Sequence, residues 1–162
     1  MPVVLLLAAL ACAGCGREPS ARVAEAVAPG SQEATLTQGD ISFHASALQT
    51  SALSEPVAAQ YGIARDAGTV MLLVAIRRGP EGQEVALPAK VTATATDLRG
   101  QQQTFEMREL RSGAPGTPPE QQLLDYVGTV RVQMPDTLRF NVQITREGSA
   151  PVQLQFAREF YP

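Results

Sequence analysis

The chain has 162 residues, of which 44% are hydrophobic, 18% charged and only 5% aromatic. Its 13 Lys and Arg residues against 16 Asp and Glu residues give a formal charge of −3. This length and composition suit one globular domain with a hydrophobic core, and they exclude collagen-like, coiled-coil and largely disordered chains. The negative charge argues against nucleic-acid binding, because affinity for phosphates needs a surplus of Lys and Arg. With one His and two Cys residues, the chain has few ligands for a zinc or redox centre, and no cofactor is expected.

An uninterrupted apolar run occupies residues 3–11. The run is shorter than the roughly 20 residues that cross a bilayer. It fits the hydrophobic region of a secretory signal, which is about 7–15 residues long. No Lys or Arg precedes it, which is a departure from the usual signal. We expect residues 1–14 to be a signal peptide, so that the mature chain works outside the cytosol.

Both cysteines, Cys12 and Cys15, follow this run. Their Cys-x-x-Cys spacing is that of redox proteins, but such a site needs a βαβ context and a helix terminus that lowers a thiol pKa, and the sequence shows neither here. Residues 12–16, Cys-Ala-Gly-Cys-Gly, resemble instead the lipobox of bacterial lipoproteins, in which small residues precede the lipidated Cys. The resemblance implies lipidation at Cys15. Cys12 is the second choice, and a plain cleaved signal is the remaining alternative.

Lipidation would make a membrane the first partner of the chain, since several acyl chains on one Cys hold a protein firmly where one chain binds only marginally. Gly16 stands where inner-membrane lipoproteins have Asp, so the same resemblance implies the outer membrane. Residues 15–37 are rich in Ala, Pro, Gly and Ser, a composition typical of a flexible linker. We expect them to tether a domain that begins at residue 38.

Short apolar–polar alternations between turn residues follow, and they predict β-strands. Seven strands are expected, at 41–43, 70–76, 91–96, 105–110, 124–132, 138–144 and 152–156. The run at 70–76 is apolar throughout, which predicts a strand covered on both faces, and Gly128 marks a candidate bulge. We expect an all-β domain over 38–162, an immunoglobulin-like antiparallel β-sandwich.

One short helix is expected at residues 54–62, between the first two strands. The segment has Ser at its first position, Pro56 in the first turn and Gly at its last position, which are the residues preferred at helix ends. Such a long excursion has to cover part of a sandwich. We expect Val57 and Tyr61 to pack the helix on the strand at 70–76.

Several motifs resemble a family of Gram-negative envelope proteins. They are Phe43-His44, Ala47, Thr50, Leu53, Pro56, Val57-Ala58, Tyr61-Gly62-Ile63, then Thr92-x-Thr94-x-Thr96-Asp97-Leu98-x-Gly100, and the ending Phe156-x-x-x-Phe160-Tyr161. On these residues, over about 38–162, the chain is similar to domain of unknown function family four-four-two-six. The resemblance implies a secreted, all-β domain that faces the periplasm, and it implies no particular activity.

The sequence offers little for catalysis or metal binding. His44 is the only imidazole, and a Ser two residues away on the same strand is about 6.6 Å distant, too far for a Ser–His hydrogen bond. Even together with Asp40 or Glu55, His44 does not supply the three or four ligands that a metal site needs. We expect no enzyme activity and no metal, and a structural role in which His44 bonds the helix segment. The paired arginines at 77–78 are interpreted as the solvated end of a strand.

We therefore expect a non-enzymatic envelope lipoprotein, held in the periplasm on a membrane or secreted into it, that binds an unidentified envelope protein or gives structural support. The candidate binding surface is His44, Thr50, Tyr61 and Arg65. The alternative is a binding protein for a small envelope ligand, in a groove between the 54–62 helix and the sheet. A pocket lined by Tyr61 and Arg65 would favour the ligand, and a filled groove would favour the interaction module.

Overall fold

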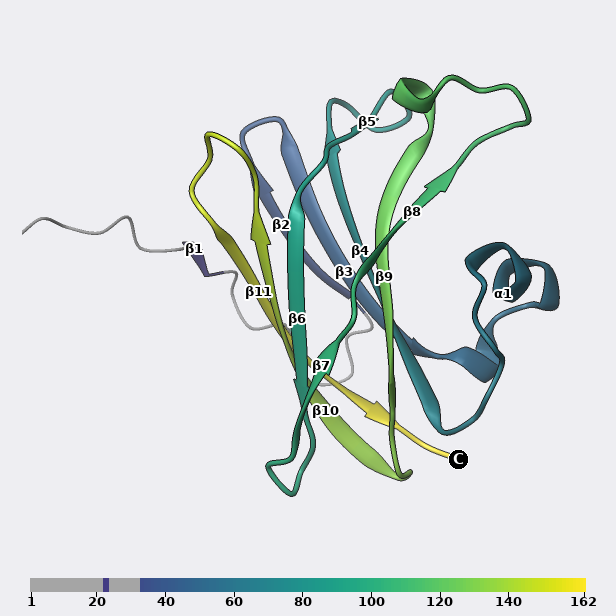
Figure 1. Ribbon diagram of the computed structural model, residues 1–162. Helices are drawn as coiled ribbons and strands as arrows, with labels where there is room; N and C mark the ends of the chain where they lie inside the picture. The colour runs from purple at the N-terminus through teal and green to yellow at the C-terminus, as the bar shows by residue number, and fades with distance from the viewer. Residues whose placement is uncertain (1–21, 24–32) are drawn as a thin grey trace, which may run out of the picture.

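A computed structural model describes residues 22–23 and 33–162 (Figure 1). The expected signal peptide at 1–14, the lipidated Cys15 and most of the tether at 15–37 lie outside the described residues.

Two β-sheets face each other across the core (Figure 1). The first sheet has the order β1 (Arg22–Val23), β11 (Val152–Phe160), β10 (Asp136–Thr145), β6 (Lys90–Thr96) and β7 (Gln102–Phe105). The second has the order β2 (Glu33–Gln38), β3 (Ile41–Gln49), β4 (Thr69–Arg78), β9 (Leu123–Arg131) and β8 (Arg108–Ser112), with β5 (Val85–Ala86) paired to the end of β4. All pairs are antiparallel except β1 with β11. This architecture confirms the predicted all-β sandwich.

The core is formed by the alternate residues of each strand that point between the sheets. Phe140 lies among three other aromatic rings, with centroid distances of 4.6 Å to Phe156, 6.0 Å to Phe105 and 6.4 Å to Phe160. Large side chains of β4, β10 and β11 are fully buried around them. The period-two pattern that predicted the strands is therefore the pattern that fills the sandwich.

The strands differ from the expected set in four places. β1 and β2 both lie inside the expected tether, because β1 pairs with β11 and Ala34 and Leu36 of β2 pack against the core. The short strand β5 is an addition that pairs with the end of β4. The strand expected at 105–110 is two strands, β7 and β8, which belong to different sheets. Phe105 points into the main core, whereas Leu110 belongs to a separate cluster on the outer face of the second sheet. A single strand in one sheet could not place Phe105 in the main core and Leu110 in the cluster on the outer face.

Gly128 is a residue of β9 that lies against residues 105–107. Figure 1 shows the chain passing from β7 to β8 beside β9. This glycine is not a bulge, because the register of β9 with β4 runs unbroken through the pair Leu72 and Gly128. A Cβ atom at this position would lie 2.9 Å from the sulfur of Met107, 3.1 Å from the carbonyl oxygen of Glu106 and 3.1 Å from the Cβ of Phe105. Glycine is present because the crossing chain touches the strand.

The α-helix α1 (Glu55–Tyr61) confirms the predicted helix and its ends. The Ser54 hydroxyl accepts a hydrogen bond from the Val57 N–H at 3.4 Å. Gly62 closes the helix in the left-handed region at φ +59, where glycine carries no steric penalty. Two further short turns of helix are 3-10, η1 (Thr50–Ala52) and η2 (Pro119–Gln121).

Helix α1 packs on the outer face of the second sheet, as predicted. An apolar cluster forms there, made by Leu53, Ala58, Met71, Leu110 and Val127, with Val57 and Tyr61 half-buried against it. β4 is therefore covered on both faces, by the main core through its even-numbered residues and by α1 through Met71. Among the described residues, no helix is both long and apolar enough to cross a bilayer.

The paired arginines at the end of β4 have different environments. The Arg77 guanidinium forms an ion pair with Asp125 of β9 and donates to the Leu124 carbonyl at 2.9 Å. The two side chains of that pair are only 11% and 13% exposed. Arg78 lies 3.5 Å from Asp40 in an exposed pair. The interpretation of both as a solvated strand end is thus wrong for Arg77, which carries charge into a covered part of the sheet.

Gly128→Ala is expected to lower the free energy of unfolding by about 1–3 kcal/mol, because the added methyl group forces the crossing chain away from β9. The neighbouring exposed substitution Thr129→Ala is the control and is expected to change it by less than about 0.5 kcal/mol. Urea unfolding measures both. Equal midpoints for Gly128→Ala and the unaltered chain would show that the contact at the crossing is not tight.

Asp125→Ala is expected to cost about 3 kcal/mol, because it leaves the covered Arg77 guanidinium without its counter-charge. Asp40→Ala, which breaks the exposed pair with Arg78, is the matched control and should cost less than about 1 kcal/mol. Thermal and urea unfolding compare the two variants. Similar losses would contradict the difference in burial.

Candidate functional site

The candidate surface of His44, Thr50, Tyr61 and Arg65 does not form one site. His44 lies on the outer face of β3, and its Nδ1 atom is 3.0 Å from Glu33 Oε1 and 3.3 Å from Thr35 Oγ1. Both partners belong to β2. The expected bond to the helix segment is therefore wrong, since strand pairing brings β2 next to His44. Six residues of extended strand, about 20 Å, separate His44 from Thr50.

Thr50 is fully buried and lines no surface. Its hydroxyl donates to the Asp66 carbonyl at 3.0 Å and accepts from the Asp66 N–H at 2.9 Å. These two bonds fix the loop behind α1 to the end of β3. The expectation of Thr50 as a surface residue is corrected by this burial, because a short Thr side chain can satisfy its hydroxyl on a neighbouring backbone.

Tyr61 and Arg65 have separate roles. Tyr61 packs its ring in the cluster under α1, and its carbonyl accepts a hydrogen bond from the Arg108 guanidinium. Arg65 is exposed, donates to the Ser51 carbonyl at 3.0 Å and lies 3.7 Å from Glu55. Of the four expected residues, Arg65 is the one that lines a groove.

The interface between α1 and the sheet is filled, and an open groove of about 810 Å³ lies beside it. We call it the arginine groove. Its walls come from three segments, residues 62–66 behind α1, residues 103–108 at the crossing, and residues 127–131 of β9. Most of the side chains in these walls are exposed. Folding is needed to create the groove, because the three segments are far apart in the sequence.

Three guanidinium groups line the arginine groove, one from each segment: Arg65, Arg108 and Arg131. Two carboxylates, Asp66 and Glu106, also line it. One Asp66 oxygen is already engaged, accepting from the Gly68 N–H at 2.7 Å and from the Thr69 hydroxyl at 3.1 Å.

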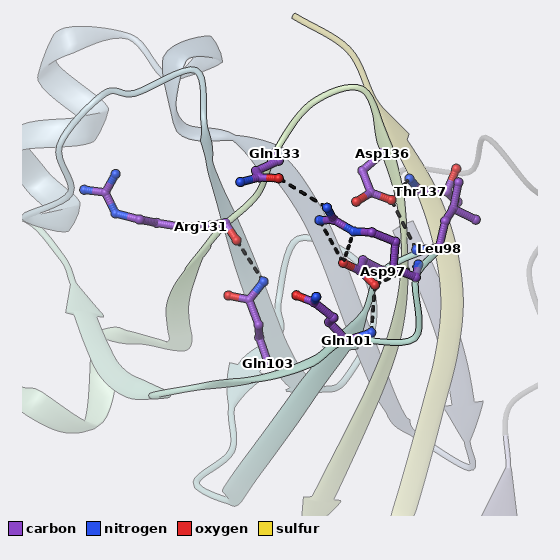
Figure 2. Close-up of polar contacts among 9 residues, drawn as sticks. Asp97, Leu98, Gln101, Gln103, Arg131, Gln133, Asp136 and Thr137 are labelled. Atoms are coloured by element: carbon purple, nitrogen blue, oxygen red, sulfur yellow. Dashed lines mark hydrogen bonds and ion pairs between the residues drawn. The ribbon is translucent and has the colours of Figure 1, made fainter.

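The guanidinium of Arg131 has no hydrogen-bond partner within the part of the chain that the structure describes, and Figure 2 shows it pointing away from its polar neighbours. The groove thus offers positive charge to an anionic group.

A second cavity, of about 550 Å³, adjoins the groove and shares Gln103 and Arg131 with it. Its polar residues form a cluster centred on Asp97 (Figure 2). Asp97 is 4% exposed and accepts hydrogen bonds from the N–H groups of Gln101 at 2.8 Å and Arg99 at 2.9 Å. The Arg99 side chain contacts the same carboxylate at 3.2 Å and reaches Gln133 Oε1 at 3.2 Å.

The pKa of Asp97 lies below its usual range. Burial raises it, but the hydrogen bonds from the Gln101 and Arg99 N–H groups, together with the Arg99 guanidinium, outweigh burial because they stabilise the charged form. Asp97 is therefore a carboxylate whose acceptor positions are taken by its own turn. This arrangement fixes the β6–β7 turn against residues 133–136 and leaves no free base.

Sequence reasoning did not identify Arg108, Arg131, Gln103 or Asp97 as site residues. The sequence does place Asp97 in a predicted turn and in the motif that ends at Gly100, and these two features could have pointed to it. The two arginines and Gln103 give no signal, since exposed arginines are common on strands. Among residues 22–23 and 33–162, no group of three His, Cys, Asp or Glu side chains is placed to hold a metal ion.

Asp97→Asn is expected to destabilise the chain at neutral pH, because a neutral amide accepts the turn's hydrogen bonds more weakly than a carboxylate. The folded pKa is depressed, so the contribution of Asp97 is fully present above the unfolded value of about 3.9 and is lost as pH falls through the folded value. Urea unfolding from about pH 7 to about pH 3 should show a constant gap between the two chains that narrows below about pH 4. A gap that does not narrow in acid would contradict the depressed pKa.

Comparison with known proteins agrees with this fold. A crystal structure of a DUF4426 family protein from Pseudomonas aeruginosa PAO1 is similar, with a TM-score of 0.60 and 24% sequence identity over 81% of this chain and 96% of that one. At this identity the likeness shows the fold alone. No curated protein matches the chain. The model of the family described as "Domain of unknown function (DUF4426)" matches residues 35–162. Because that match covers most of the sequence, the chain belongs to the DUF4426 family.

Proposed function

We propose that the chain is a non-enzymatic module of the cell envelope that binds another envelope protein. The observation that carries this proposal is the contrast on the outer face of the second sheet. Ala58, Met71 and Val127 fill the contact between α1 and the sheet, while the arginine groove beside it is open. An open groove with exposed polar walls suits a segment of protein better than a buried small molecule.

The titratable side chains support a role without catalysis. His44 is bonded to β2, and Asp97 is saturated by its own turn. In the arginine groove the Thr69 hydroxyl donates to Asp66 at 3.1 Å, but the same Asp66 oxygen also accepts from the Gly68 N–H at 2.7 Å, so this carboxylate is engaged in its own turn and is not the free base that covalent catalysis needs. Binding by surface contact is what remains for the charges that line it.

The proposed location is the periplasmic side of the outer membrane, with a lipid anchor on Cys15. The support is the apolar run at 3–11, the lipobox-like residues 12–16 and the linker composition that follows. Because β1 begins at Arg22 and pairs with β11, residues 16–21 separate Cys15 from the first strand of the sandwich, and as a flexible linker they would span about 13 Å.

A small envelope ligand is the second candidate, and one observation favours it. Arg65 lines the arginine groove, whose volume of about 810 Å³ lies in the range of ligand pockets. Tyr61, which this alternative expected in the same pocket, is instead packed under α1. Ligand pockets bury most of their ligand, and the exposed walls of this groove argue for a larger partner.

Two labels in intact cells test the proposal. A radioactive fatty acid is expected to label the chain and its Cys12→Ser variant but not Cys15→Ser. A photo-crosslinking amino acid at Thr129, in the groove, is expected to give one protein adduct, whereas the same residue at Arg139, exposed on the other sheet, gives none. Labelling that survives Cys15→Ser would contradict the anchor. No protein adduct at Thr129, or equal adducts at both positions, would contradict the interaction surface.

A further inference from the structure

We propose that the arginine groove binds an extended acidic peptide as an added β-strand on the free edge of β9. This inference rests on the proposed function and names the chemistry of the partner. It comes from three observations: the place where β8 stops, the direction of the backbone groups that it leaves behind, and the charges around the space.

β9 is longer than its neighbour on one side. β8 pairs with it from Leu123 to Val127, and β9 continues to Arg131 while remaining paired with β4. No described strand pairs with residues 128–131 on the other side. Residues 106–107, which precede β8, come across from β7 in the first sheet (Figure 1). They pass close to Gly128 and do not pair with residues 128–131, and the arginine groove occupies the space beside that part of β9.

The backbone of Thr129 points into this space. The Val132 N–H donates to the Gly68 carbonyl at 2.8 Å, so even-numbered residues of β9 direct their backbone groups toward β4. Odd-numbered residues face the opposite side, which agrees with the Gln103 amide that donates to the Arg131 carbonyl at 2.9 Å. Thr129 therefore presents one N–H and one C=O to the groove, the pair that an antiparallel strand uses.

Gln103 limits how far such a strand extends. Because its side chain occupies the Arg131 carbonyl, the added segment pairs at Thr129 and ends at the bridge between β7 and β9. The required ligand has both a donor and an acceptor in one main chain. A peptide supplies both, whereas a phosphate or a carboxylate alone supplies only acceptors.

Charge selects the side chains of the peptide. Residues directly opposite in an antiparallel pair point to the same face, with their Cβ atoms about 4.5–5.5 Å apart. Arg131 shares the outer face of β9 with Thr129 and Val127, the face on which α1 also packs. Acidic side chains of the peptide on that face would meet the unpartnered Arg131, with Arg65 and Arg108 on the flanking walls. Basic side chains would meet three guanidinium groups against two carboxylates, Asp66 and Glu106, and one oxygen of Asp66 is already engaged by Gly68 and Thr69.

The test measures binding of fluorescein-labelled peptides to the full-length chain in detergent by fluorescence polarisation. The probe is a peptide of about eight residues that alternates Val and Glu. It is expected to saturate below about 1 mM. The same peptide with Lys for Glu is expected to bind at least about tenfold more weakly, and so is the Val–Glu peptide with its central amides N-methylated, which keeps the charge and removes main-chain donors.

Arg131→Glu is expected to weaken binding of the Val–Glu peptide by about tenfold or more. Arg139→Glu on β10 is the matched control, since it makes the same charge change at an exposed site of the other sheet, and it should leave affinity within about twofold. Circular dichroism verifies that both variants fold. If Arg131→Glu does not fold, Arg65→Glu in the loop behind α1 takes its place with the same expectation.

Three results would overturn the inference. The Val–Glu peptide could show no saturable binding, the Glu and Lys peptides could bind with equal affinity, or the Arg131→Glu variant could bind the Val–Glu peptide as tightly as the unaltered chain. An N-methylated peptide that binds normally would exclude strand addition. Sedimentation that shows a dimer dissociated by Arg131→Glu would mean that a second copy occupies the edge. If the peptides fail while the crosslink at Thr129 persists, the inference is wrong and the interaction module stands. If the crosslink at Thr129 is also absent, the strand-addition inference and the proposed interaction module are both wrong.

Discussion

The contact between the crossing chain and Gly128 is the constraint on which the rest of the structure depends. A chain that changes sheets at the edge of a sandwich has to pass close to a strand of the sheet it joins. Here Glu106 and Met107 approach within about 3 Å of where a Cβ would stand on Gly128. Because glycine permits this approach, β7 closes the edge of the first sheet and β8 extends the second. The same crossing ends β8 early and leaves Thr129 and Arg131 at an open edge.

The outer face of the second sheet has a closed part and an open part. In the closed part, α1 and β8 bury Met71 and Val127 in an apolar cluster. In the open part, polar and charged residues surround a groove of about 810 Å³. Edge strands of natural proteins are usually protected by charge, by short length or by a covering segment. Under the strand-addition proposal, the three arginines of the groove would serve as such protection against unselective pairing and would admit an acidic strand.

Charges elsewhere in the sandwich are mostly used internally. Asp125 balances Arg77 in a covered position, and the turn that follows β6 saturates Asp97. Arg99 joins that turn to Gln133 through a hydrogen bond of 3.2 Å. These pairs hold the two sheets and their connections in place. Against this background the unpartnered guanidinium of Arg131 stands apart, because it lies on an edge where the backbone also offers hydrogen bonds.

The sequence by itself determined the fold class and the helix. Period-two alternation marks each long strand, since residues facing the core must be apolar, and the residues at 54 and 62 define the ends of α1 through local hydrogen bonds and backbone angles. The tertiary structure alone decided which sheet received each strand, so the segment at 105–110 divided in two, and it alone buried Thr50 and paired His44 with β2. It also assembled the groove from segments up to about 70 residues apart in the sequence. The physical reason is range: periodicity and capping depend on neighbours within a few residues, whereas a site on a sandwich depends on pairings that form only when the two sheets close on one core.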